Sequence, residues 1–196
     1  MKKLFASVFV SAAVLCLTSC SVAGGGGRTM ENGLDCSFTS EADITLDKLR
    51  AEGTISRFGE GEWEAEFTSP NTLSGVKLTF SGGNVSADYK GLSFSVPRSA
   101  LPVKAMLLEL IEAVDTNARA DKLSGSEKEG IFMIDGSLEG GDYILSLDEN
   151  GDISSFDMPN NLLRISFHDV QHTEIQLPDV QPETVQENTI DNSCTQ

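Results

Sequence analysis

Hydrophobic positions between Ser99 and Thr116 recur every three or four residues, which is the spacing of one helix face. This apolar stripe contains Val103, Met106, Leu107, Leu110, Ile111 and Val114. The opposite side is polar and contains Lys104, Glu109, Glu112 and Asp115. The pattern predicts one amphipathic helix. Ser99 is in an N-cap position, and Pro102 leaves the start open by one to three residues.

From Cys36 onward, apolar and polar residues alternate instead, which is the period of a β-strand with one wet face. In residues 62–67, for example, Trp63, Ala65 and Phe67 alternate with three glutamates. Turn-forming residues separate the strands at 58–61, 69–71, 82–84, 90–91, 140–141 and 148–151. Residues 117–130 are polar and predict a loop anchored by Leu123.

About ten short strands with one interposed helix predict a mainly β, α+β fold. The strands follow one another through short connections, so the sheet is antiparallel and must curl as it grows. The only covering element for its apolar face is the helix. We therefore expect a curved antiparallel half-barrel that holds the amphipathic helix on its concave face, within residues 36–170.

The first residues have the layout of a secretory signal, with Lys2 and Lys3 before an apolar run too short to span a bilayer. The run ends in Leu17-Thr18-Ser19-Cys20, which resembles the lipobox of bacterial lipoproteins. The resemblance implies cleavage after residue 19 and a lipid anchor on Cys20, with palmitate among its acyl groups. The chain would then lie on the extracytoplasmic side of the cell membrane. The alternative is an ordinary signal peptide that contains a cysteine.

Charge and composition separate the ends of the chain from its core. The formal net charge is −16, which disfavours binding to nucleic acid or to anionic lipid head groups, so membrane attachment must come from the anchor. Residues 20–35 are rich in glycine and predict a flexible tether. Residues 171–196 are acidic, contain no lysine or arginine, and predict a disordered tail.

Few residue patterns indicate chemistry, and we expect neither an enzyme nor a bound cofactor or metal. His168 and His172 have strand spacing for a shared face, but no third ligand is near in the sequence. The spacing from Asp148 to Asp152 is better explained by a hairpin turn than by a calcium loop. Cys36 and Cys194 are the only cysteines left after processing and acylation, and they would form a disulfide only if the fold brings them together.

The stretch from Thr68 to Val96, TSPNTLSGVKLTFSGGNVSADYKGLSFSV, resembles the LolA/LolB-type lipoprotein-carrier fold, and more closely its lipid-anchored relatives in Gram-positive bacteria. It has a proline before a Leu-x-Gly turn, then a strand, a Gly-Asn turn and a strand that ends in Tyr-x-Gly-Leu. The resemblance implies a half-barrel closed by helices around an apolar cavity for acyl chains. This chain departs from it in having one predicted helix.

Two functions follow from this fold. In the first, the protein binds or transfers a lipid-like apolar ligand such as an acyl chain. The sheet residues that would line its cavity are Trp63, Phe67, Leu78, Phe80, Tyr89 and Phe94, and the roof residues are Val103, Leu107 and Leu110. In the second, the same residues form an ordinary filled core, and the chain is an interaction or scaffold lipoprotein with a protein partner in the cell envelope. Leu108 lies off the helix stripe and is expected to be exposed.

Overall fold

The computed structural model describes residues 27–95 and 102–172, with only the backbone for residues 102–105. The signal sequence, Cys20 and most of the expected tether therefore lie outside the described residues. The same holds for Cys194 and the rest of the predicted acidic tail.

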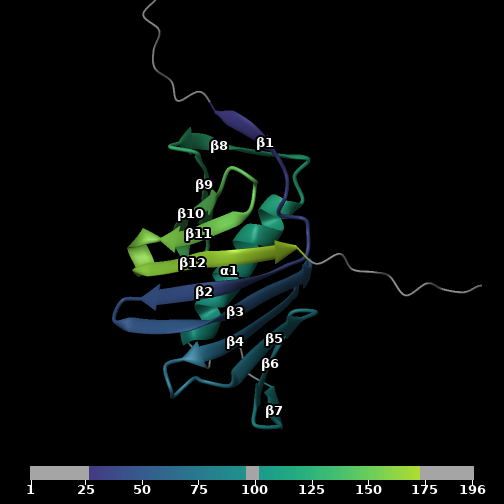
Figure 1. Cartoon of the computed structure of the whole chain (residues 1–196), viewed down its shortest axis with the longest axis vertical. Coiled ribbons are helices and arrows are strands. Elements are labelled where there is room, and N and C mark those ends of the chain that lie inside the picture. Colours follow the sequence, from purple (N-terminus) through teal and green to yellow (C-terminus); the bar gives the residue numbers. More distant parts are fainter. Residues whose placement is uncertain (1–26, 96–101, 173–196) are drawn as a thin grey trace, which may run out of the picture.

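In the described residues, twelve antiparallel strands form one open sheet, and one α-helix lies against it (Figure 1). The strand order is β1-β8-β9-β10-β11-β12-β2-β3-β4-β5-β6-β7. In chain order the elements are β1 (Arg28–Glu31), β2 (Phe38–Leu46), β3 (Leu49–Gly59), β4 (Glu62–Ser69), β5 (Val76–Ser81), β6 (Asn84–Tyr89), β7 (Leu92–Ser95), α1 (Pro102–Ala118), β8 (Lys122–Lys128), β9 (Ile131–Leu138), β10 (Gly141–Leu147), β11 (Ile153–Met158), the 3₁₀ turn η1 (Pro159–Asn161) and β12 (Leu163–His172).

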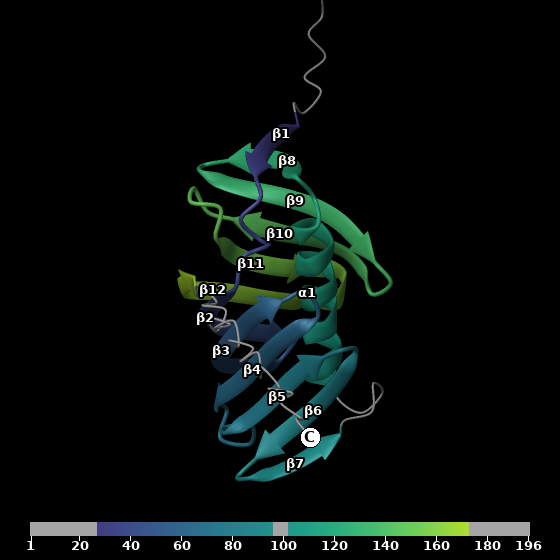
Figure 2. The ribbon, with the colours of Figure 1, turned by 90° about the vertical axis from the view of Figure 1, so that its right-hand side faces the viewer.

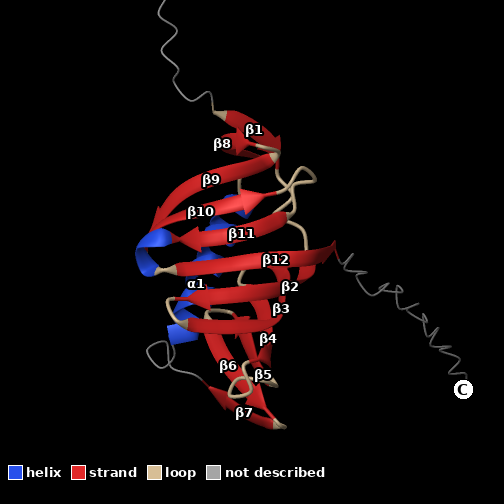
Figure 3. Cartoon of the chain, turned by 60° about the vertical axis from the view of Figure 1, so that its left-hand side comes forward, coloured by secondary structure: helices blue, strands red, loops and turns tan. Residues whose placement is uncertain are grey.

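The sheet consists of two meanders that meet where β12 pairs with β2. The first runs from β2 to β7 through consecutive hairpins, and the second runs from β8 to β12 in the same way. Helix α1 connects the last strand of the first meander to the first strand of the second, so it must cross the sheet from one end towards the other. Figure 2 shows α1 running along the inner side of the curved sheet, and Figure 3 shows the strands with the helix behind them. The expected half-barrel with one helix is confirmed.

The apolar stripe of α1 packs into the sheet as its periodicity predicts. Leu110, Ala113 and Val114 are fully buried, and Leu107 is 2% exposed. Opposite them the second meander contributes Leu145, Phe156 and Ile165, which are also fully buried. This half of the helix–sheet interface is therefore a closed core, and such packing is the main source of stability in a domain of this size.

The N-terminal boundary of the fold lies earlier than the sequence pattern indicates. The end of the expected tether belongs to the folded domain, because Arg28–Glu31 forms β1 and Leu34 is 2% exposed. Asn32 explains why this polar segment is ordered. Its side-chain amide donates to the backbone carbonyls of Asn117, Ala118 and Ala120, which satisfies acceptors that the end of α1 leaves free.

The loop expected over residues 117–130 is also different, since β8 occupies Lys122–Lys128. Only Leu123 of this strand is buried, so the sequence lacks the alternation that normally marks a strand. The strand forms because it pairs with β1 and β9 on its two sides. At the other end of the second meander, β12 continues to His172, two residues past the expected boundary.

Candidate functional site

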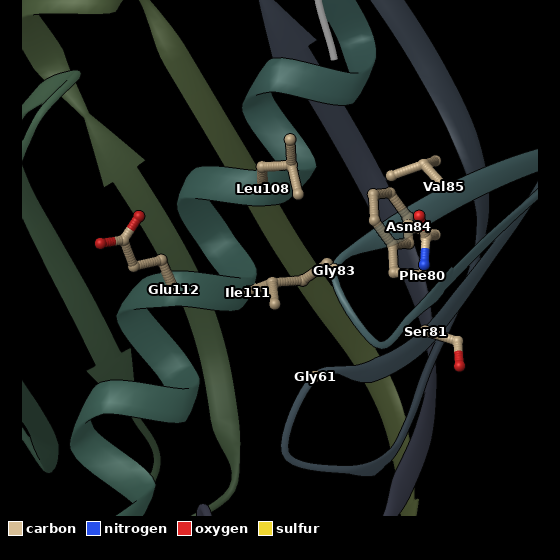
Figure 4. Close-up of a pocket in the computed structure, with 9 residues that line it drawn as sticks. All are labelled: Gly61, Phe80, Ser81, Gly83, Asn84, Val85, Leu108, Ile111 and Glu112. Atoms are coloured by element: carbon tan, nitrogen blue, oxygen red, sulfur yellow. The ribbon is translucent and has the colours of Figure 1, made fainter. Parts of the chain in front are cut away.

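A groove opens between α1 and the β5–β6 hairpin, away from the closed core (Figure 4). It has a volume of about 220 Å³. Four apolar side chains dominate its walls: Phe80, Val85, Leu108 and Ile111. The remaining lining residues are Gly61, Ser81, Gly83, Asn84 and Glu112.

The two sides of the groove follow from local geometry. Phe80 and Val85 are directly paired across β5 and β6, so both side chains lie on the inner face of the sheet. On the helix, Ile111 belongs to the predicted apolar stripe and Leu108 lies beside it, and both are only partly buried. Figure 4 shows Ile111 directed towards Gly83 at the hairpin turn. Gly83 lines the groove without adding a side chain to it.

A buried ion pair lies close to the groove. Arg57 Nε donates to Asp115 Oδ1 over 3.0 Å, and these residues are 3% and 6% exposed. Asp115 Oδ2 also accepts from the backbone N–H of Gly61 at 2.8 Å and from Nε1 of Trp63 at 3.2 Å. The pair ties α1 to the β3–β4 turn, whose Gly61 lines the groove, and so holds that wall in place. The helical pattern put Asp115 on the polar side; it is buried because its charge and both oxygens find partners.

The nine residues predicted to line a cavity separate into four groups. Phe80 lines the groove. Trp63, Phe67, Leu78, Leu107 and Leu110 are at most 3% exposed and belong to the core. Tyr89 and Phe94 lie outside the core, with exposed fractions of 38% and 52%, and the Val103 side chain lies outside the described residues. Sequence reasoning missed Val85, Leu108 and Ile111 as lining residues. The position of Leu108 off the stripe was the one available signal.

An exposed apolar surface extends from the groove along β6 and β7. We call it the apolar strip and define it as Ala87, Tyr89, Leu92 and Phe94. Ala87 pairs with both Leu78 and Phe94, so Phe94 shares the inner face with the core residue Leu78. In the next row, Tyr89 pairs with both Val76 and Leu92. The strip is thus a continuation of the inner face beyond the part that is closed.

The histidines and the acidic turn have structural partners. His168 Nε2 lies 3.1 Å from Asp43 Oδ2, whereas His172 Nε2 lies 2.5 Å from Asp152 Oδ1. A register shift in β12 lies between His168 and Gln171, and the two rings have different carboxylate partners. Among the residues that the structure describes, no three His, Cys, Asp or Glu side chains are grouped for a metal ion.

The predicted hairpin turn at residues 148–151 is confirmed. Asp148 Oδ1 accepts from the backbone N–H groups of Asn150 and Asp152, each at 2.9 Å. The carboxylate thus closes the turn itself, as aspartate often does.

Cys36 is exposed and lies just before β2. Partial burial, followed by the charge of Asp35, raises the pKa of its thiol above the ordinary value, so little reactive thiolate forms at neutral pH. Because Cys194 is outside the described residues, the disulfide between them stays a prediction.

No protein-family model and no curated protein matches this chain. Solved structures with a similar arrangement include an outer membrane lipoprotein-sorting protein domain, as it is described, from Vibrio parahaemolyticus (TM-score 0.37, 10% identity, 76% of this chain and 89% of that chain). Others are a LolA superfamily protein from Nitrosomonas europaea (0.33, 10%, 74% and 89%) and a DUF1329 family protein from Desulfovibrio piger (0.39, 13%, 74% and 88%).

These likenesses concern the fold. The architecture that the resemblance to LolA-type proteins implies, a curved antiparallel sheet with a helix on its inner side, is confirmed. A relationship to lipid-anchored proteins of Gram-positive bacteria stays a prediction. In the described part of the chain, no helix has the length and apolar content needed to cross a membrane.

Proposed function

We propose that this chain is a lipid-anchored envelope protein that binds one acyl chain in the groove between α1 and the β5–β6 hairpin. The observation that carries the proposal is the apolar wall formed by Phe80, Val85, Leu108 and Ile111 around an open volume of about 220 Å³. An apolar cavity of about 150 Å³ is enough to hold benzene, whereas sites for larger ligands have about 300–1,000 Å³. The groove therefore fits part of one hydrocarbon chain.

The closed half of the interface limits the ligand further. Leu110, Ala113 and Val114 of α1 are fully buried against the sheet. Since native cores are packed to the density of organic crystals, this region has no room for a second chain. The proposed ligand thus has one acyl chain in the groove, fewer than the several acyl chains that a lipoprotein-carrier cavity would take.

Attachment to the membrane rests on the sequence around Cys20. The signal-like segment and the Leu17-Thr18-Ser19-Cys20 motif support acylation and an extracytoplasmic position. The net charge of −16 gives no attraction to an anionic membrane surface, so the anchor must supply the attachment. Metabolic labelling with an alkyne analogue of palmitate tests this: the wild-type chain should be labelled and Cys20→Ala should not.

The competing function is an interaction lipoprotein with a filled core. The fully buried half of the helix–sheet interface favours it, and so does β7, an edge strand without charged residues that offers unpaired backbone groups to a partner strand. In this case the groove would be an incidental gap, and purified protein would contain no lipid.

Mass spectrometry of lipids that co-purify with the processed chain separates the two functions. We expect an acyl lipid in wild-type protein and its loss in Leu108→Asp. Leu108 is only partly buried, so this variant should keep its far-ultraviolet circular dichroism, unlike a substitution of the core residue Leu107. Leu162→Asp is the control, because Leu162 is 60% exposed and lies outside the groove. Lipid-free wild-type protein that also takes up no lipid from vesicles would contradict the proposal.

A further inference from the structure

The geometry points to a ligand class: we infer a single-chain amphiphile with an anionic head, whose chain end fills the groove, whose remaining chain lies on the apolar strip, and whose head meets Lys90. This inference rests on the proposed function and names its substrate class. A fatty acid and a lysophospholipid with an anionic head share this chemistry.

The apolar strip continues the groove along one face of β6. Val85 lines the groove, and Ala87 and Tyr89 follow it on the same face of β6. At about 3.3 Å per residue, the step from Val85 to Tyr89 adds roughly 13 Å to the length of the site. Beside these residues on β7, Phe94 and Leu92 are 52% and 61% exposed. A chain longer than the groove can therefore cover apolar side chains that now face water.

The small side chain of Ala87 shapes the strip. It stands between two larger side chains in one row, Leu78 on β5 and Phe94 on β7. The row is therefore lower in its middle than at its sides, which suits a narrow hydrocarbon chain lying along β6. A second row of Val76, Tyr89 and Leu92 extends the same surface to the β6–β7 turn.

A cation stands where the strip ends. Lys90 occupies the β6–β7 turn, and its Nζ lies 5.1 Å from the centre of the Tyr89 ring, over the end of the strip. Lys77 and Lys122 pair with glutamates, but among the ion pairs of the described residues none involves Lys90. Asp88 belongs to the opposite face of β6, where its partner across β5 is Lys77.

The position of this cation is informative because the chain as a whole is acidic, with a net charge of −16. The general field repels an anionic ligand, so a preference for anions must come from a local group. Exposed charge pairs are modest, and we expect Lys90 to strengthen the binding of an anionic head by about two- to fivefold. The strip itself should contribute more, since covering a Phe side chain favours binding by about tenfold or more.

The test measures binding to the processed chain by the fluorescence of Trp63, the one tryptophan in the sequence and the partner of Phe80 across β4 and β5. Palmitoyl lysophosphatidylglycerol and palmitoyl lysophosphatidylcholine share a chain and differ in head charge. Octanoate is the short probe, which fits the groove without reaching the strip. All probes are used below their micelle concentrations.

We expect the wild-type chain to bind lysophosphatidylglycerol about two- to fivefold more tightly than lysophosphatidylcholine, and Lys90→Gln to remove this difference. Phe94→Ser should weaken both palmitoyl lipids about tenfold and leave octanoate unchanged. The controls are Lys48→Gln, at the exposed β2–β3 turn, and Leu162→Ser. Both should leave the preference between the two head groups and the affinity for palmitoyl lipids unchanged.

The outcomes distinguish failure of the proposed function from failure of the inferred ligand class. If no probe binds to the wild-type chain, the proposed function fails and this inference fails with it. If the probes bind but Lys90→Gln and Phe94→Ser behave like the controls, acyl-chain binding in the groove is retained and the inferred ligand class is overturned. It is also overturned if Phe94→Ser leaves binding intact and instead turns a dimer into a monomer in sedimentation, because the strip would then be covered by a second copy of the chain.

Discussion

The two edge strands of the sheet, β1 and β7, differ in charge and in exposed apolar side chains. At the β1 end the edge strand is charged: Arg28 pairs with Glu127, and Glu31 lies 2.5 Å from Lys122 of β8. At the other end β7 contains two serines with Leu92 and Phe94, all of them exposed and none charged. Figures 1 and 2 place these strands at opposite ends of the domain.

Charged edge strands are a common protection against unwanted pairing and apolar contact, so β1 has the features of a surface that meets only water. β7 lacks them, and its apolar side chains continue into the groove. One edge of the sheet is therefore protected by charge and the other is not, which is consistent with the proposed binding surface at the β7 end. β1 and the proposed binding surface therefore lie at opposite ends of the domain.

The largest effect is expected where α1 is held to the sheet beside the groove. Asp115→Ala would leave Arg57, which is 3% exposed, with only the backbone carbonyls of Asp35 and Cys36 as acceptors and no carboxylate partner. Loss of one member of a buried ion pair costs about 3–5 kcal/mol. Urea unfolding measures this loss. The double variant Arg57→Met with Asp115→Leu should recover much of it, because no buried charge remains.

The matched control for the buried pair is Glu60→Ala, which removes a fully exposed pair with Arg119 and should leave the unfolding midpoint nearly unchanged. Equal midpoints for Asp115→Ala and Glu60→Ala would mean that the pair does not hold the helix, and the groove wall would lose its support.

A second substitution pair compares the closed and open sides of α1 directly. Leu110→Ala should destabilise the domain by about 2–5 kcal/mol, because it leaves a cavity in a packed core. Leu108→Ala removes the same atoms from a partly buried position at the groove and should cost about 1 kcal/mol or less. Both are read from urea unfolding. Similar costs for the two variants would show that Leu108 is core and that the groove is closed in solution.

The same contrast explains what the sequence could predict. Strict periodicity correctly predicts which side chains face the interior, such as Leu107 and Leu110 in the helix and Trp63 and Phe67 in a strand. Their positions depend on local patterns of period 3.6 or 2. β8 and the segment around Asn32 were missed, because their order depends on partners far along the chain.

The sequence left open whether the interior is filled or contains a cavity, and it did not indicate Val85, Leu108 or Ile111 as lining residues of the groove. Periodicity identifies which residues face the interior, but not where the interior is full. Phe80 and Leu107 both follow an apolar pattern and are both buried, at 4% and 2% exposed, yet Phe80 lines the groove and Leu107 does not. The sequence pattern also gave no sign that Asp115 is buried, because its burial depends on Arg57, which lies 58 residues away along the chain.

A smaller effect on stability is expected at the open edge. Phe94→Ser should change the free energy of unfolding by about 0.5 kcal/mol or less, because this side chain is 52% exposed and lies outside the closed core. It should nevertheless lower the fluorescence of a dye that binds apolar surface. Met30→Ser at the β1 edge is the comparison: Met30 packs against the core, so its loss should reduce stability without lowering dye fluorescence. The reverse result would exchange the roles of the two edges.

The smallest expected effect concerns Glu109 of α1, beside the β9–β10 turn. Burial, and then the negative charge of Glu112, raises the pKa of the Glu109 carboxyl above its ordinary value of 4.5. Its Oε2 is buried and has no hydrogen-bond partner among the described residues. The folded state thus binds this proton more tightly than the unfolded state does, so stability decreases as the pH rises from 4.5 through the folded pKa.

Glu109→Gln removes this pH dependence because the amide is neutral at every pH. At neutral pH the variant should be more stable than the wild-type chain by about 0.5 kcal/mol, and the difference should shrink as the pH falls towards the ordinary carboxyl value. Urea unfolding of both chains over a pH series measures it. Glu112→Gln removes only the charge contribution and should give a smaller gain in the same direction. A constant difference between Glu109→Gln and wild type at all pH values would mean that this carboxyl titrates alike in the folded and unfolded chains, and that the Glu109 side chain is more open to water than its burial indicates.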